Sequence, residues 1–122
     1  MLVADDHPEI VKAICRLLAL DCEVVGTVSD GGDVLGAVQR LRPDVLVIDL
    51  NLPTISGLEL CRQITQGQPE TKVIMFTAAN DPHLRQRAAE VGAAAFVCKV
   101  GSDDDLLSTV KSVCGPQLTS DL

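Results

Sequence analysis

Five residues with metal-binding or nucleophilic side chains stand directly after short apolar runs of the sequence. They are Asp5, Asp6, Asp49, Thr77 and Lys99. In an open parallel sheet, functional sites form just beyond the carboxyl ends of the strands, so the residue that follows each apolar run is a candidate site residue. If the runs are neighbouring strands, these five side chains converge at one edge of the sheet.

Three of the five are carboxylates, and carboxylates within ~4–6 Å of one another repel unless a cation lies between them. An all-oxygen ligand set suits Mg²⁺ or Mn²⁺ better than zinc. Each residue alone has a simpler explanation, because an Asp or Thr after a strand often caps the next helix, and a Lys there is usually solvated. Capping does not require three acids, a hydroxyl and an ammonium group to meet, so the whole set indicates a site.

Five apolar segments are predicted as strands. Residues 1–4, 45–48 and 73–76 are near-continuous apolar runs, and residues 23–28 and 93–98 fit less cleanly. Such runs are typical of parallel strands that are covered on both faces.

Helical periodicity lies between and after these strands, over residues 10–18, 34–41, 58–64 and, more weakly, 82–91. Ser102 and Asp105 resemble a capping box before a last helix that ends at Gly115. This alternation predicts an α/β fold with a central parallel sheet and helices on both faces. Residues 115–122 have no periodicity, and we expect them to form a tail or linker.

Composition narrows the function. A chain of 122 residues with 47% hydrophobic content suits one folded domain. Its formal net charge of −7 disfavours direct binding to nucleic acid, which depends on clustered Lys and Arg. No apolar run approaches the ~20 residues that a bilayer-spanning helix needs, so we expect a cytoplasmic protein without membrane contact.

The five cysteines are an odd number without a Cys-x-x-Cys pair, and they are predicted to be reduced, buried thiols. Only His7 and His83 could join them as soft metal ligands, which argues against a zinc site. The sequence has no Trp or Tyr, so few aromatic side chains could stack on a flavin or a base.

In order and spacing, these motifs resemble the response-regulator receiver domain, especially receivers of LuxR-like transcription factors. The resemblance rests on VADDHP at 3–8, PDVLVIDLNLP at 43–53 with Gly57, Thr77-Ala78, and the segment from Gly92 to Lys99. It implies a flavodoxin-like (CheY-like) doubly wound five-stranded parallel sheet of order 2-1-3-4-5, with five helices on both faces. Residues 1–114 would form the receiver domain.

The same resemblance implies that Asp49 accepts a phosphoryl group from a phosphohistidine of a sensor histidine kinase or phosphotransfer protein. Thr77 and Lys99 would hold the phosphoryl oxygens. The implied ligands of Mg²⁺ are Asp5, Asp6, Asp49 and the backbone carbonyl of Asn51. Such a domain is a phosphoacceptor with self-phosphorylation and autodephosphorylation activity, and not a conventional enzyme.

The implied output is a switch at Thr77 and Phe96. Inward movement of Thr77 would let Phe96 turn inward and change the surface of the fourth helix, the fifth strand and the fifth helix. The readout would be homodimerisation or control of a tethered DNA-binding domain outside this chain, and hence of transcription.

Three other functional classes fit less well. A metal-dependent phosphatase that passes through an aspartyl phosphate needs an acid two residues after the nucleophile, where this chain has Asn51. A flavin carrier needs a Ser/Thr-Gly-rich loop after the first strand, which the sequence lacks. An interaction domain that is never phosphorylated would not need the intact acid set.

Overall fold

The computed structural model describes residues 1–18, 23–78, 81–98, 108–110 and 112–113. Strands and helices alternate along the chain as β1 (Leu2–Ala4), α1 (Pro8–Leu18), β2 (Gly26–Val28), α2 (Gly31–Leu41), β3 (Val45–Ile48), α3 (Gly57–Gly67), β4 (Lys72–Thr77), α4 (Pro82–Glu90) and β5 (Ala95–Cys98). Residues 108–110 and 112–113 are also helical and belong to the fifth helix. The predicted capping box at Ser102 and the tail 115–122 lie outside the described residues.

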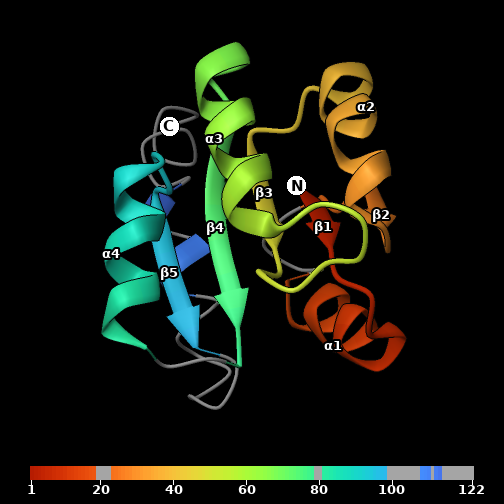
Figure 1. Cartoon of the computed structure of the whole chain (residues 1–122). Coiled ribbons are helices and arrows are strands. Elements are labelled where there is room, and N and C mark those ends of the chain that lie inside the picture. The colour runs from red at the N-terminus through yellow and green to blue at the C-terminus, as the bar shows by residue number, and fades with distance from the viewer. Residues whose placement is uncertain (19–22, 79–80, 99–107, 111, 114–122) are drawn as a thin grey trace.

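The five strands form one parallel sheet in the order β2-β1-β3-β4-β5, which confirms the predicted topology. Their carboxyl ends all lie at the lower edge of the sheet in Figure 1. β1 is an interior strand because it pairs with β2 on one side and with β3 on the other. The residues that follow β1 and β3 are therefore neighbours across the sheet.

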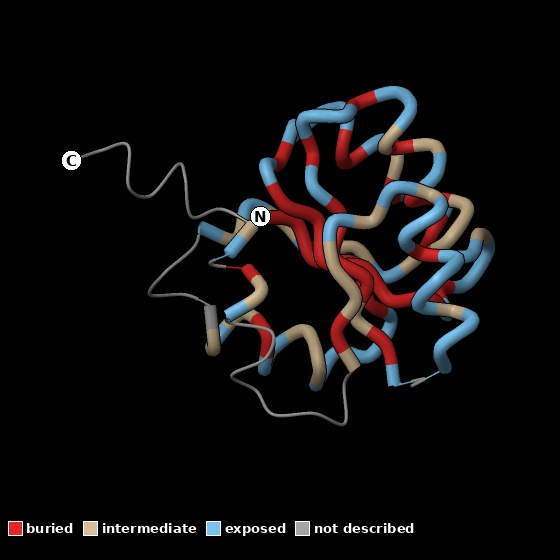
Figure 2. Tube along the Cα trace, turned by 90° about the vertical axis from the view of Figure 1, so that its left-hand side faces the viewer, coloured by how far each residue is buried: buried red, intermediate tan, exposed pale blue. Residues whose placement is uncertain are grey.

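Two apolar clusters cover the two faces of this sheet. On one face, Leu2, Leu46 and Met75 pack with buried residues of α2, α3 and α4. On the other face, Val3 and Val47 and their neighbours pack with α1 and with the helical residues around position 110. Figure 2 shows the buried residues concentrated along the strands, with the outer sides of the helices exposed. Burial on both faces explains why β1, β3 and β4 have near-continuous apolar sequences.

The two less clear strands begin later than the sequence pattern predicts. β5 begins at Ala95 because Gly92 and Ala93 terminate α4: Gly92 has a positive φ of 97°, and Ala93 N–H donates to the Ala88 carbonyl at 2.9 Å. This hydrogen bond is typical of a Schellman motif. β2 begins at Gly26, which pairs with Leu2 at the start of β1. Before it, Val25 N–H still donates to Met1 O at 2.9 Å, but the regular strand pairing starts at Gly26.

The cysteines are less buried than predicted. Cys61 is fully buried, and burial raises the pKa of its thiol to about 11, whereas Cys15 and Cys98 are half-buried. All three are free thiols, as expected, and Cys22 and Cys114 lie outside the described residues.

Across the described part of the chain, no helix combines the length and the apolar character that crossing a membrane requires.

Candidate functional site

The acid cluster forms where β1 and β3 end side by side. Hydrogen bonding continues one residue past each strand, since Asp5 N–H donates to Val28 O at 3.0 Å and Asp49 N–H donates to Ala4 O at 2.9 Å. Both aspartates are buried, each with 3% of its surface exposed. The backbone therefore holds Asp5 and Asp49 next to each other, as the strand-end argument predicted.

Asp6 and His7 complete this cluster. One potential ligand atom from each of Asp5, Asp6, His7 and Asp49 lies within 4.8 Å of all the others. Asp6 is more exposed than Asp5, so it borders the cluster on the solvent side. Three carboxylates in so small a volume repel, and a hard divalent cation with oxygen ligands would neutralise them. The donor set thus fits the predicted Mg²⁺.

The His7 imidazole is the member of the cluster that the sequence argument did not include. Its Nδ1 lies 2.8 Å from Asp5 Oδ1, 3.0 Å from Asp6 Oδ1 and 3.9 Å from Asp49 Oδ2. The signal in the sequence is its position directly after the acid pair, whereas the absence of a zinc motif concerns only its pairing with cysteines.

The loop after β3 fixes the Asp49 carboxylate. Asn51 N–H donates to Asp49 Oδ1 at 3.1 Å, and this contact points one carboxylate oxygen back toward the loop. The backbone also packs tightly at Gly57, where an added Cβ would lie 2.5 Å from the Asp49 carbonyl oxygen. Only glycine therefore lets α3 begin this close to Asp49.

The same loop is attached to the start of α2. Gly31 N–H donates to Pro53 O at 3.0 Å, and Thr54 Oγ1 donates to Asp30 Oδ2 at 3.1 Å. Asp30 also caps α2 by accepting from Gly32 N–H at 2.7 Å. Thr54 itself has a positive φ of 77°. These contacts hold the loop in one position beside Asp49.

Thr77 and Phe96 lie on the neighbouring strands β4 and β5. Thr77 is fully buried at the end of β4 and pairs with Cys98, while Phe96 pairs with Met75. Thr77 does not cap the next helix, because Asp81 caps α4 by accepting from His83 N–H at 2.8 Å.

Phe96 is half-buried against the cluster under α4, and the Arg85 guanidinium lies 4.8 Å from its ring centroid. Lys99 lies outside the described residues. The structure therefore brings Asp5, Asp6 and Asp49 into one cluster and places Thr77 and Phe96 on the two strands beyond β3.

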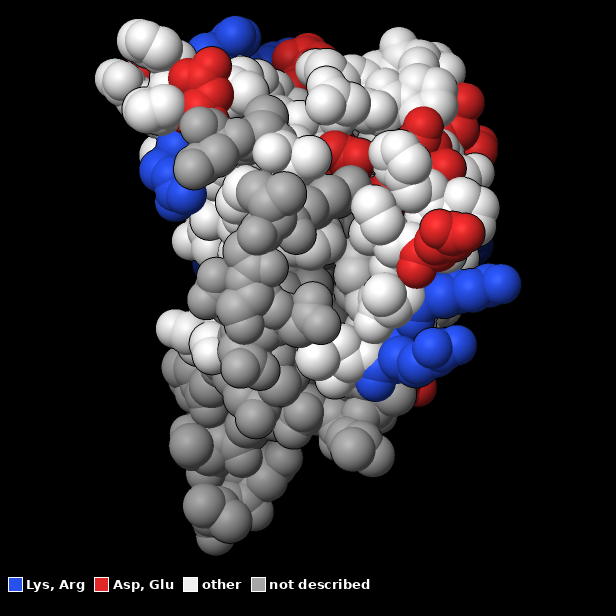
Figure 3. Space-filling model, turned by 90° about the horizontal axis from the view of Figure 1, so that it is seen from below, with Lys and Arg blue, Asp and Glu red and all other residues white. Residues whose placement is uncertain are grey.

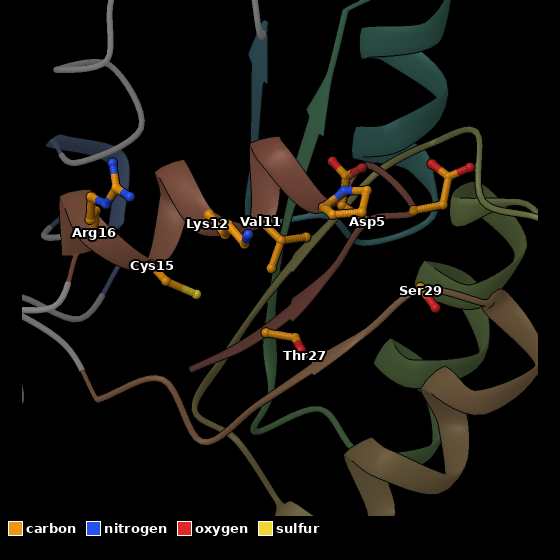
Figure 4. A pocket seen from close by; sticks show the side chains of 9 residues that line it. Asp5, Val11, Lys12, Cys15, Arg16, Thr27 and Ser29 are labelled. Carbon is orange, nitrogen blue, oxygen red and sulfur yellow. The ribbon is translucent and has the colours of Figure 1, made fainter.

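A groove of about 680 Å³ adjoins the acid cluster between α1 and the edge strand β2. Figure 4 shows Asp5 and Ser29 toward one end and Cys15 and Arg16 toward the other, with Lys12 and Thr27 between them. The cluster is thus open to solvent on the α1 side.

Viewed from below, toward the carboxyl ends of the strands, the described surface carries several separate acidic patches, and basic side chains lie near its margins (Figure 3).

Known proteins with similar sequences are response regulators. The chain is 33% identical over 120 residues to the response regulator GacA of Pseudomonas aeruginosa, covering 96% of this chain and 56% of that protein. It is 34% identical over 116 residues to the oxygen regulatory protein NreC of Staphylococcus haemolyticus, covering 93% and 54%. The chain spans about half the length of the curated relatives that it matches.

Solved receiver domains have the same fold. The signal receiver domain of the response regulator NarL from Mycobacterium tuberculosis superposes with a TM-score of 0.86 at 27% identity, covering 91% of each chain. The BeF₃-activated DrrB receiver domain superposes with a TM-score of 0.84 at 32% identity, covering 93% of this chain and 95% of that one.

The match to a family extends over nearly all of the sequence. Residues 1–111 match the response regulator receiver domain. Together with the 2-1-3-4-5 sheet and the acids that follow β1 and β3, this match shows that the chain belongs to the response-regulator receiver domain family of two-component systems.

Proposed function

We propose that Asp49 is the phosphoacceptor of this receiver and takes its phosphoryl group from a phosphohistidine on a sensor histidine kinase or phosphotransfer protein. The observation that carries this assignment is the position of Asp49, a buried carboxylate at the end of a central strand, within 4.8 Å of the ligand atoms of Asp5 and Asp6. Receiver domains are phosphoacceptors that typically bind Mg²⁺ at such an acidic cluster.

The transfer forms one bond and breaks one. An Asp49 carboxylate oxygen attacks phosphorus, the bond from phosphorus to the donor imidazole nitrogen breaks, and the imidazole keeps the electron pair of that bond. Asn51 N–H already donates to Oδ1 of Asp49, which fixes the orientation of the carboxylate before the attack. The loop contacts described above hold the carboxylate still, which lowers the entropic cost of reaching an in-line geometry.

The cation would be held by Asp5, Asp6, Asp49 and the Asn51 carbonyl, and it would supply positive charge near the phosphoryl oxygens. Thr77 would donate its hydroxyl hydrogen to a phosphoryl oxygen, and Lys99 would pair with another. Both contacts would exist only after transfer. They would therefore bias the domain toward a conformation in which Thr77 and Phe96 have moved.

We infer that the output runs through the surface around α4, β5 and the fifth helix. The supporting observation is that Phe96 lies under α4 and pairs with Met75, which precedes Thr77 by two residues in β4. Residues 1–114 would form the receiver, and residues 115–122 a tail or linker. The relatives are transcriptional regulators of about twice this length, so the readout would be homodimerisation or control of a DNA-binding domain.

The test is phosphorylation by acetyl phosphate with Mg²⁺, followed by intact-mass spectrometry. The unmodified domain is expected to gain one phosphoryl group, and Asp49→Asn to gain none. Asp44→Asn is the matched control because Asp44 is exposed and precedes the same strand at its opposite end. Equal uptake by Asp49→Asn, or loss of uptake in Asp44→Asn alone, would show that the acceptor is another residue.

A further inference from the structure

We propose that the His7 Nδ1 nitrogen is a ligand of the cation site, and that it makes the site prefer a transition-metal dication over Mg²⁺. The inference rests on the cation site proposed above and adds a side chain to it. Its chemical class is a mixed nitrogen and oxygen site, which Co²⁺ and Zn²⁺ occupy more readily than an all-oxygen site.

The distances around Nδ1 match those within a metal coordination shell. In an octahedral shell with bonds of about 2.1 Å, adjacent ligand atoms lie about 3.0 Å apart and opposite ones about 4.2 Å apart. The His7 nitrogen lies 2.8 Å and 3.0 Å from the Asp5 and Asp6 oxygens and 3.9 Å from the Asp49 oxygen. It is thus placed as an adjacent ligand to Asp5 and Asp6 and nearly opposite Asp49.

The backbone holds the imidazole in this place. His7 N–H donates to Asp5 Oδ1 at 2.9 Å, and its carbonyl accepts from Val11 N–H at 3.1 Å. Pro8 follows directly and begins α1, which restricts the backbone of His7 further. The ring therefore reaches the cluster through a short, constrained turn between β1 and α1.

Burial shows which coordination position the ring would fill. The side chains of Asp5 and Asp49 are 2% and 4% exposed, whereas that of His7 is 58% exposed. His7 thus lies on the solvent side of the cluster. In a Mg²⁺ site, positions on that side usually hold water, which Mg²⁺ gives up reluctantly. An imidazole there replaces water with a ligand that suits transition metals.

A hydrogen bond from Nδ1–H to Asp5 Oδ1 is the competing explanation of the same 2.8 Å distance. The two explanations predict opposite effects of removing the ring. A ligand contributes affinity, so its loss weakens metal binding. A hydrogen-bond donor occupies the carboxylate that the metal needs, so its loss leaves binding equal or stronger.

The experiment measures metal binding directly, without a phosphodonor. Calorimetry with Mg²⁺, Mn²⁺, Co²⁺ and Zn²⁺ would be compared for the unmodified domain and His7→Ala. We expect His7→Ala to lose at least about tenfold in Co²⁺ and Zn²⁺ affinity and less than about threefold in Mg²⁺ affinity. His83→Ala is the matched control, because His83 is the other histidine of the chain and lies exposed in the first turn of α4. Asp6→Asn should lower the affinity for all four metal ions.

A spectroscopic readout tests the bond itself. Pulsed electron paramagnetic resonance of the Mn²⁺ complex should show the modulation of a coordinated ¹⁴N, and His7→Ala should abolish it while His83→Ala keeps it. Unchanged or stronger Co²⁺ binding in His7→Ala, or absence of the ¹⁴N signal in the unmodified domain, would overturn the proposal. Failure of the phosphoacceptor assignment would be seen separately, as phosphorylation of Asp49→Asn while the unmodified domain still shows the ¹⁴N signal.

Discussion

The two helices that precede and follow β4 along the chain, α3 and α4, are packed to different extents. α3 packs three fully buried side chains against the sheet, Leu60, Cys61 and Ile64, and Ser56 caps its start. α4 buries only the small Ala88 among its residues, and its large apolar side chain, Leu84, is half-buried. α3 begins directly after the Asp49 loop, whereas α4 covers Phe96.

This difference indicates a division of roles. A helix with much buried apolar area is costly to move, and a helix with little can shift at small cost. In the function proposed above, α3 would keep the Asp49 loop in place, and α4 would be the element that responds when Phe96 moves. The firmly packed helix and the loosely packed helix thus lie on the same face of one sheet.

The largest expected effect comes from a matched pair of side-chain truncations, one in each helix. Leu60→Ala in α3 should lower the free energy of unfolding by about 2–5 kcal/mol, because it leaves a cavity in a fully buried site. Leu84→Ala in α4 should lower the free energy of unfolding by only about 1 kcal/mol, since the Leu84 side chain is already half-exposed. Urea unfolding followed by circular dichroism measures both. Equal losses would show that α4 is as firmly packed as α3.

A smaller effect is expected at Arg85, which lies over the Phe96 ring. Arg85→Ala should cost about 0.5–1 kcal/mol, the usual strength of an exposed cation–π contact, and Arg85→Lys should restore part of it. The more informative readout is the NMR signal of the Phe96 ring with and without beryllofluoride. The Ala variant should shift the resting ring toward the beryllofluoride-bound state. Identical Phe96 ring signals in the unmodified domain and in Arg85→Ala would mean that Arg85 does not hold Phe96.

The smallest expected effect is on the exposed surface of α3. Arg62 Nε donates to Glu59 Oε2 at 2.8 Å, and the hydrogen bonds from Arg62 and Gln63 lower the pKa of Glu59 from 4.5 to about 2. A lowered pKa means that this contact stabilises the fold above pH 4.5 and is lost as the pH falls through about 2. Because the pair is exposed, solvent screens it strongly.

Carbon-detected NMR titration of the Glu59 carboxyl would measure that pKa. In Arg62→Gln the midpoint should return toward 4.5, with little change in stability at neutral pH. A midpoint that stays near 2 in this variant would assign the shift to another group.

The sequence predicted the sheet well where burial dominates. β1, β3 and β4 are covered on both faces, so their composition carries the signal, and the acids that follow β1 and β3 could be placed from strand order alone. The start of α2 was harder. Its pattern is apolar only from Val34, yet the helix begins at Gly31, where an added Cβ would lie 2.6 Å from the Ile55 carbonyl oxygen. The Asp30 cap and a contact with a distant loop together set that boundary, and apolar periodicity reports neither.

The site shows the same limit. The ends of paired strands fix where the backbone lies, so the proximity of Asp5 and Asp49 could be predicted. The direction of a side chain on a turn depends instead on local hydrogen bonds. The His7 ring reaches the acids because of the turn between β1 and α1, and Arg85 reaches Phe96 from a different helix. Neither contact follows from spacing along the chain.

The pairing of β1 with β3 also has a consequence for how the chain folds. Among the strand pairs it joins the residues that lie farthest apart along the chain, Leu2 with Leu46, so it closes the longest loop. The same register brings Asp5 next to Asp49, and closure of this loop therefore also brings like charges together. Non-local parallel pairing is already slow, and this repulsion adds to its barrier. The rate of folding should thus depend on ionic strength, because dissolved cations screen the repulsion in the transition state.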